Sequence, residues 1–524
     1  MIRSRARTRG AAAAVVLAFL LAAGGADGGD SSAVGQITVA PGGDVLVSQD
    51  RNPIVARNSP VLAVNPMQPT NMVVVDRVDR PDFTAGVHIT NNGGANWQDV
   101  ALKPPAGVAG KLFAPAATYD DEGMLYVSFV MLTGPGNSPD SFWVARSGDG
   151  GLSFDDPTRI AGPHTFQTTL AADPKGRRLF AAWLQSNPVA SECELCFAET
   201  GLPIVVSRSD DGGRTWSAPT QVSDGGRMRV GAPSLAGDPD GNPAVLYVDY
   251  GDDRVDWENL PGTDDGRFSL VLARSADRGV RYAPGRVVDA EIVAPGRFLV
   301  YLPPRPSFAI GDNGDMLAVW ADRRSGDSDI LLRRSTDDGT TWSAPVPVNR
   351  GAVGDGVPQD LPAVSVSPGG RIDVVYYDRT LDRRGSMADV LLSSSSDSGA
   401  SFPKTFRLST QASNRRVGPE GSPHSDEADF GSRISVASLS GGAVAAWTDT
   451  RNGSADTDKQ DVFSASVPLS DNRSVALAFR VLAGLGILLG MAGVTLFLLS
   501  RRARRRAPTE AAPEVSIDEP ATEH

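Results

Sequence analysis

Cysteine and histidine are scarce in this chain, which has two cysteines and four histidines among 524 residues. Cys193 and Cys196 stand together in S-E-C-E-L-C-F and form one C-x-x-C pair. Such a pair is half of a zinc site, and no second Cys/His pair lies in an obvious partner position. A redox centre would need a thioredoxin-like α/β context, which the sequence lacks. We therefore expect a local disulfide that staples a loop.

Positive charge is also in deficit, because 50 Lys and Arg residues face 62 Asp and Glu residues, for a net charge of −12. Binding to nucleic acid without sequence preference depends on basic side chains that neutralise phosphates. We therefore expect no nucleic-acid partner. The 56 glycines and 38 prolines are typical of a β-rich protein with many turns.

The two ends of the chain carry long apolar runs. Residues 1–26 place four arginines before an apolar run and then small residues, which is the order of a secretory signal. Residues 481–500 form an uncharged stretch long enough to span a bilayer, and five arginines follow it within 501–506. We predict a single-pass protein of the cell membrane, with most of the chain outside the cell. The remaining segments are linkers at 27–35 and 470–480 and a cytoplasmic tail at 501–524.

Six copies of one short pattern recur between these ends. The shared form is Ser/Thr-x-Asp-x-Gly-x-x-aromatic, as in S-T-D-D-G-T-T-W (Ser335 to Trp342). Successive copies start 57, 62, 66, 60 and 60 residues apart, and a regular period of this size indicates a repeat protein. The third position holds Asn92 in the first copy and then Asp149, Asp211, Asp277, Asp337 and Asp397.

The chemistry of the pattern is that of a turn between two strands. The Asp side chain is able to accept hydrogen bonds from backbone N–H groups of the turn, and the Ser or Thr two residues earlier adds a second local bond. The glycine supplies a backbone conformation that other residues rarely adopt. A catalytic role is the alternative, but six equivalent copies cannot share one active site. We therefore predict that these aspartates are structural.

Four short strands accompany each copy, which favours an all-β propeller of four-stranded blades over residues 36–469. Six units contain the turn pattern, and a seventh at 432–468 stops after its third strand. Residues 37–48 (I-T-V-A-P-G-G-D-V-L-V-S) resemble the missing fourth strand. We therefore predict seven blades, closed by joining the two ends of the array in one blade, with six blades as the alternative.

The repeated turn is similar to the Asp box, or bacterial neuraminidase repeat, of the sialidase superfamily. The chain thus resembles a membrane-anchored bacterial member of that superfamily over residues 36–469, most strongly between Trp320 and Trp342. The resemblance implies a sialidase-like glycosidase that acts on exposed glycans. It also implies that the Asp boxes lie on the face opposite the substrate.

A retaining sialidase, as the resemblance implies, uses three arginines for the sialic acid carboxylate, a Tyr nucleophile activated by Glu, and an Asp acid/base. The arginine of the family's R-I-P motif is matched by Arg57 in A-R-N-S-P, and the acid/base position points to Asp82, or to Asp79. Phe430 stands where the family has its Tyr. This departure keeps open the alternative of a noncatalytic propeller that binds a polysaccharide or a protein.

Segments that do not repeat are the other functional candidates, because function resides in loops on a rigid scaffold. Trp257 beside Glu258 suits sugar stacking and acid/base chemistry, or weak Ca²⁺ binding, with a solvated acidic loop as the alternative. Residues 297–306 offer Tyr301 and Arg305. We expect no cofactor and no metal centre. The candidate sugar-binding residues are Trp257 and Tyr301, and the candidate catalytic residues are Arg57, Asp82, Glu258 and Arg305.

A second element, W-x-D-x-R, occurs twice, from Trp320 to Arg324 and from Trp447 to Arg451. Its repetition favours a structural ion pair at a strand end. The alternative is that one copy has been recruited into the functional site.

Overall fold

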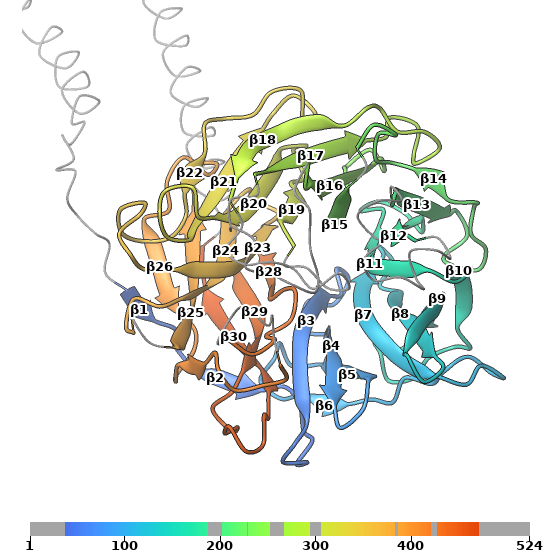
Figure 1. Cartoon of the computed structure of the whole chain (residues 1–524), viewed down its shortest axis with the longest axis horizontal. Coiled ribbons are helices and arrows are strands. Elements are labelled where there is room, and N and C mark those ends of the chain that lie inside the picture. The colour runs from blue at the N-terminus through green and yellow to red at the C-terminus, as the bar shows by residue number, and fades with distance from the viewer. Residues whose placement is uncertain are drawn as a thin grey trace, which may run out of the picture.

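The computed structural model describes residues 37–186, 202–227, 229–251, 267–293, 305–382, 386–420 and 427–470. Their strands form seven sheets arranged around a central axis, so the predicted all-β propeller has seven blades (Figure 1). In this part of the chain no helix has the length and hydropathy of a membrane span. The predicted signal and membrane segments, 1–26 and 481–500, lie outside the described residues.

Six blades contain four strands that follow one another outward from the axis, and the first strands of neighbouring blades contact each other around the ring. Blades 1 to 3 consist of β3 (Ala56–Val64), β4 (Met72–Arg80), β5 (Thr84–Thr90) and β6 (Gln98–Asp99); β7 (Lys111–Tyr119), β8 (Leu125–Thr133), β9 (Ser138–Ser147) and β10 (Thr158–Ala161); and β11 (Thr165–Ala172), β12 (Leu179–Gln185), β13 (Ile204–Ser209) and β14 (Thr220–Gln221).

Blades 4 to 6 have the same strand order. They consist of β15 (Val230–Gly237), β16 (Pro243–Asp249), β17 (Phe268–Arg274) and β18 (Arg286–Ile292); β19 (Ser307–Ile310), β20 (Met316–Asp322), β21 (Asp329–Ser335) and β22 (Val346–Pro347); and β23 (Gln359–Val366), β24 (Ile372–Asp378), β25 (Met387–Ser395) and β26 (Lys404–Arg407), with the short β27 (Ser413–Asn414) paired to β25. The outer strand of blade 5 is short because Pro347 and the preceding Pro345 cannot donate to a strand ladder.

Blade 7 joins the two ends of the array, as predicted. β28 (Ser435–Leu439), β29 (Gly442–Asp449) and β30 (Asp461–Pro468) form its first three strands, and β2 (Asp44–Leu46) pairs antiparallel with β30 as the fourth. The segment predicted as that strand is divided, however. β1 (Ile37–Val39) pairs in parallel with β26 of blade 6, and the left-handed Gly42 and Gly43 redirect the chain toward blade 7. The N-terminal segment therefore holds two blades together (Figure 1).

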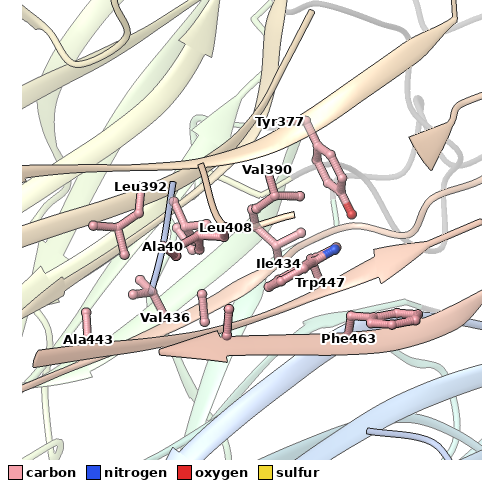
Figure 2. Packing of buried hydrophobic residues seen from close by; sticks show 14 of the residues in the cluster. Ala40, Tyr377, Val390, Leu392, Leu408, Ile434, Val436, Ala443, Trp447 and Phe463 are labelled. Carbon is pink, nitrogen blue, oxygen red and sulfur yellow. The ribbon is translucent and has the colours of Figure 1, made fainter. Parts of the chain in front are cut away.

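Packing between neighbouring blades forms the hydrophobic core. Between blades 6 and 7, Tyr377, Val390 and Leu392 lie against Val436 and Trp447 (Figure 2). Trp447 is fully buried, and its indole N–H donates to Asp449 at 3.2 Å. Arg451 forms an ion pair with the same carboxylate at 2.7 Å. Trp320, Asp322 and Arg324 repeat these contacts in blade 5, so the W-x-D-x-R element is a structural ion pair in both copies.

The Asp boxes form the turns between the third and fourth strands, with the predicted hydrogen bonds. In blade 5 the Ser335 hydroxyl donates to Asp337 at 2.8 Å, and the Thr341 backbone N–H donates to Asp337 at 2.8 Å. The bonds from Thr341 and Ser335 lower the pKa of Asp337 to about 2. Gly339 has φ of +73°, and a Cβ there would lie 2.4 Å from Leu272.

The alternation of strands defines two faces of the ring. The Asp boxes share one face, here called the Asp-box face, with the turns between first and second strands. The first strands begin and the second strands end at the opposite face, here called the mouth face. Residues 77–80 of β4 and those just before β19 and β28 therefore lie at the mouth face.

Candidate functional site

Two arginines meet at the axis of the ring on the mouth face. Arg305 precedes β19 of blade 5, and its guanidinium donates to the Thr168 carbonyl of blade 3 at 3.1 Å. Arg433 precedes β28 of blade 7, and its guanidinium donates to the Pro115 carbonyl of blade 2 at 2.8 Å. The Arg305 backbone N–H also donates to the Ser432 carbonyl at 3.2 Å. Because these contacts join blades that are not neighbours, both side chains lie in the central channel.

Bulges in the first strands present some of the carbonyls that hold these arginines. The pairing shifts in β3, β7, β11, β15 and β23, each next to a residue with positive φ. A proline follows in four of the five, which suits a bulge because proline cannot donate to the ladder. At or next to three of these positions, a backbone carbonyl accepts a hydrogen bond from Arg305 or Arg433. The positive-φ residues are Ser59, Ala114, Gln167, Ala232 and Leu361.

Arg305 and Arg433 form no ion pair with any carboxylate of the described residues. Nε and Nη2 of Arg305 are buried without a hydrogen-bond partner, as are the nearby hydroxyls of Thr168 and Ser432. Burial lowers the pKa of Arg305 to about 10. Burial, with repulsion from Arg305 and Arg77, lowers the pKa of Arg433 well below its ordinary value. Both side chains keep partial contact with solvent. The channel mouth therefore presents positive charge and N–H donors that are available to an anion.

Arg77 extends this positive region and brings carboxylates with it. It lies on β4, and its Nη2 contacts Asp79 at 2.6 Å and Asp429 at 2.5 Å. The Asn58 amide donates to Asp79 Oδ2 at 2.8 Å, whereas Oδ1 of Asp79 is buried without a partner. Burial raises the pKa of Asp79, and the negative charge of Asp429 adds to the effect. Asp79 is therefore a carboxyl group inclined to hold a proton beside the arginines.

Tyr250 closes the side of the channel formed by blade 4. It follows β16, is 9% exposed, and packs edge-on against Phe268 with ring centroids 5.1 Å apart. Burial raises the pKa of its hydroxyl, and Arg305 partly offsets that effect. A Cβ at Gly231 would lie 3.2 Å from the Tyr250 hydroxyl, so glycine leaves room for the ring.

Only part of the predicted site can be located. Arg305 lies at the channel mouth, where it contacts the Thr168 carbonyl. Asp82 is exposed on the loop between β4 and β5, where Lys111 contacts it at 2.6 Å and lowers its pKa. The predicted site residues outside the described part of the chain are Glu258, Trp257, Tyr301, Cys193 and Cys196.

Arg57, a candidate catalytic residue, does not fit that role, because its charge is neutralised inside blade 1. Its Nη1 lies 3.0 Å from Asp76, and His88 bridges Asp76 and Asp99 at 2.6 Å on each side. Burial alone would lower the pKa of His88, but Asp76 and Asp99 raise it. The Gln49 backbone N–H donates to Asp99, so this network also fixes the segment after β2. Arg57 therefore belongs to a structural network of charges.

Phe430 is 2% exposed and has a packing role. Arg415 lies 4.2 Å from its ring centroid, and the ring packs edge-on against Tyr377. Arg415 also forms ion pairs with Asp360 at 3.0 Å and with Glu427 at 3.5 Å. A cation over an aromatic face is a stable arrangement, so this position packs the junction of blades 6 and 7.

The sequence contains a signal for the second channel arginine. Arg305 begins R-P-S-F and Arg433 begins R-I-S-V, which share the form Arg-x-Ser before a first strand. Both serines have the same role, since Ser307 accepts from the Val364 N–H at 2.9 Å and Ser435 from the Leu62 N–H at 3.0 Å. The serine bonds the next blade while the arginine enters the channel. Arg77 has no comparable signal.

Comparison with known proteins found similar solved structures but no matching family. No family model matches the sequence, and no curated protein matches it. Solved structures that are similar include a Hadza microbial sialidase (15% identity, 77% of this chain and 75% of that chain, TM-score 0.43). They also include a Penicillium chrysogenum alpha-L-arabinanase complexed with arabinobiose (15%, 67% and 97%, 0.42) and an ulvan lyase (10%, 82% and 96%, 0.47). At these identities the similarity concerns the fold alone.

Among the described residues, no group of three or more His, Cys, Asp or Glu side chains is arranged to hold a metal ion. Arginines offer recognition of an anion, and Asp79 offers proton transfer.

Proposed function

We propose that this protein is a sialidase-like glycoside hydrolase that acts on acidic glycans at the channel mouth. The observation that carries the proposal is the pair Arg305 and Arg433, which have no carboxylate partner among the described residues. A sugar carboxylate supplies the charge and the acceptor atoms that these groups lack. Arginine suits this task because its planar fork binds both oxygens of a carboxylate.

Burial of a cation without a partner is unfavourable, and this supports a role in binding. The lowered pKa of Arg305 reflects the unfavourable free energy of burying its charge. Proteins retain such an unfavourable charge where a bound ligand compensates it. Arg77 differs, because the Asp429 carboxylate already neutralises it and Asp79 also accepts a hydrogen bond from it. In the proposal Arg305 and Arg433 bind the substrate, and Arg77 positions Asp79.

Asp79 is the proposed general acid. Hydrolysis of a glycosidic bond requires a proton on the departing oxygen, and a carboxyl group with a raised pKa holds that proton nearer neutral pH. Its Oδ1 is free of hydrogen bonds within the described structure. Asp82 fits the role less well, because Lys111 lowers its pKa and so favours the ionised form.

The second candidate function is binding of the acidic glycan without hydrolysis. The observation that favours it is the buried Phe430, which occupies the position where the resemblance places a Tyr nucleophile. Both functions use the same arginines, and they differ in whether the glycosidic bond breaks.

The test is hydrolysis of a fluorogenic sialoside by the full-length protein in detergent, alongside calorimetric binding of sialic acid. Arg305→Met should lower kcat/KM at least ~100-fold, as expected for a lost contact between paired charges. Asp79→Asn should lower kcat ~10²- to 10⁴-fold, as expected for loss of a general acid. Arg177→Met and Asp156→Asn are matched controls, because both residues are exposed and distant from the mouth face.

Three results distinguish the candidates. Turnover that depends on Arg305 and Asp79 supports the hydrolase. Binding that depends on Arg305 without turnover supports the noncatalytic alternative. Neither turnover nor binding rules out both.

We also propose that residues 481–500 anchor the protein in the cell membrane with the channel mouth facing away from it. What supports the orientation is that β30 ends on the Asp-box face, where Arg371 donates to the Leu469 carbonyl at 3.3 Å. The linker 470–480 spans at most about 40 Å when fully extended. On intact cells, an antibody should reach an epitope inserted after Val108 but not one placed after His524. Access to the C-terminal epitope would contradict the proposed topology.

A further inference from the structure

Two phenylalanines stand beside the arginine cluster at the mouth face. Phe83 lies in the loop between β4 and β5, and Phe113 lies on β7 of blade 2. Their rings pack edge-on with centroids 5.2 Å apart, and both side chains remain partly exposed. Such a pair offers an apolar aromatic surface at the rim of a polar channel.

Contacts place this aromatic pair beside the residues that surround the proposed anion site. The Arg77 guanidinium lies 5.8 Å from the centroid of the Phe113 ring. Phe113 also precedes by two residues Pro115, whose carbonyl holds Arg433.

Polar groups border the outer side of the same pair. Lys111 lies 5.9 Å from the Phe83 ring centroid and forms an ion pair with Asp82 at 2.6 Å. Both charged side chains are accessible to solvent, at 36% and 65%. An apolar surface with hydrogen-bonding groups at its edge is suited to a pyranose, which has apolar C–H faces and hydroxyls around its rim.

We infer that Phe83 and Phe113 form a stacking subsite for the neutral sugar next to the acidic sugar of the glycan. The inference rests on the proposed function, because the arginines determine where the acidic sugar lies. The subsite makes the protein selective for oligosaccharides over the free acidic sugar. It also gives Asp82 and Lys111 a role, since they contact hydroxyls of the stacked ring.

The test is calorimetric binding by the full-length protein to two probes, methyl α-sialoside and 3′-sialyllactose. The wild type should bind sialyllactose ~10-fold more tightly than the monosaccharide, because contacts with the two aromatic rings together are worth about that factor. Phe83→Ala and Phe113→Ala should remove most of this preference and leave binding of the monosaccharide unchanged. Phe402→Ala is the matched control, because this half-buried aromatic belongs to an Asp box on the other face.

Each outcome has a definite meaning. Loss of the preference in both variants supports the subsite. If both probes bind and the variants keep the wild-type preference, the subsite is refuted while the proposed function stands. If neither probe binds the wild type, the proposed function fails and the subsite fails with it. Unfolding midpoints measured in parallel should show that each Phe→Ala variant is folded under the binding conditions.

Discussion

Replacing Arg305 by Met should stabilise the protein and abolish binding of its acidic ligand. Arg305 is a charged group in the channel, and two of its nitrogens have no hydrogen-bond partner in the described structure. Met has a similar length and fills the space without a charge. The usual expectation for such a substitution is a loss of stability, so a gain would be informative.

The expected gain follows from two opposing contributions. Burial lowers the pKa of Arg305 to about 10, and at 1.36 kcal/mol per pKa unit this disfavours the charged form by about 3 kcal/mol. The substitution also removes the bond to the Thr168 carbonyl, and a bond from a charged donor contributes about 1.5–3 kcal/mol. The net change should be a gain of up to about 1.5 kcal/mol in the free energy of unfolding.

Urea unfolding of the full-length protein in detergent, followed by tryptophan fluorescence, measures this difference. Arg177→Met serves as the control, and its free energy of unfolding should change by no more than about 0.5 kcal/mol. Added sialic acid should stabilise the wild type in proportion to its occupancy and have no effect on Arg305→Met.

One result would refute this reasoning. If Arg305→Met lost more than about 1 kcal/mol, the guanidinium would have to form further bonds inside the protein, because its one bond to the Thr168 carbonyl is worth no more than the cost of burying the charge. The channel arginines would then not need an anion to complete their interactions. Equal stabilisation of both proteins by sialic acid would place its binding elsewhere.

Three further predictions concern the scaffold. The pKa of His88 is raised in the folded state, so protonated His88 stabilises the fold. This contribution is complete below pH 6.5 and is lost as the pH rises through the pKa of the folded state. Urea unfolding at pH 6 to 9 should show a decline in the free energy of unfolding that is absent in His88→Gln. Arg371→Met should cost about 3–5 kcal/mol in urea unfolding, because it leaves Asp373 buried and unpaired, and a loss below 1 kcal/mol would contradict the buried ion pair. Gly339→Ala should lower the unfolding free energy by about 2–4 kcal/mol, since the new Cβ meets Leu272 in a left-handed turn, whereas the open Gly314→Ala should lose only the smaller conformational part.

The blade architecture could be predicted from the sequence because its signals are local and repeated. Each Asp box binds its own turn through residues at most six positions apart, and the strands around it recur in the same order. The seventh blade was accessible for the same reason, since its missing strand has a counterpart at the N-terminus. Local patterns do not specify which strand a segment pairs with. The pairing of β1 with blade 6 could therefore not be predicted from the sequence.

The candidate site was harder to predict from the sequence because it is assembled from segments far apart in the chain. Arg433 contacts Ser59 and Pro115, which lie more than 300 residues away in sequence. Arg57 fitted a motif but lies next to Asp76, and only the register of β3 and β4 reveals that pairing. A motif identifies a type of residue, whereas the partner of its charge decides whether it is free to bind a ligand.

The division of the N-terminal segment between two blades has a consequence for biosynthesis. β2 pairs with β30, so the seventh blade stays incomplete until almost the whole ring has been synthesised. Until then β2 lacks its partner strand, and unpaired strand edges promote association between chains. A circular permutant that places residues 37–48 after residue 470 would convert this last long-range pairing into a local hairpin. Such a chain should fold faster and aggregate less during refolding.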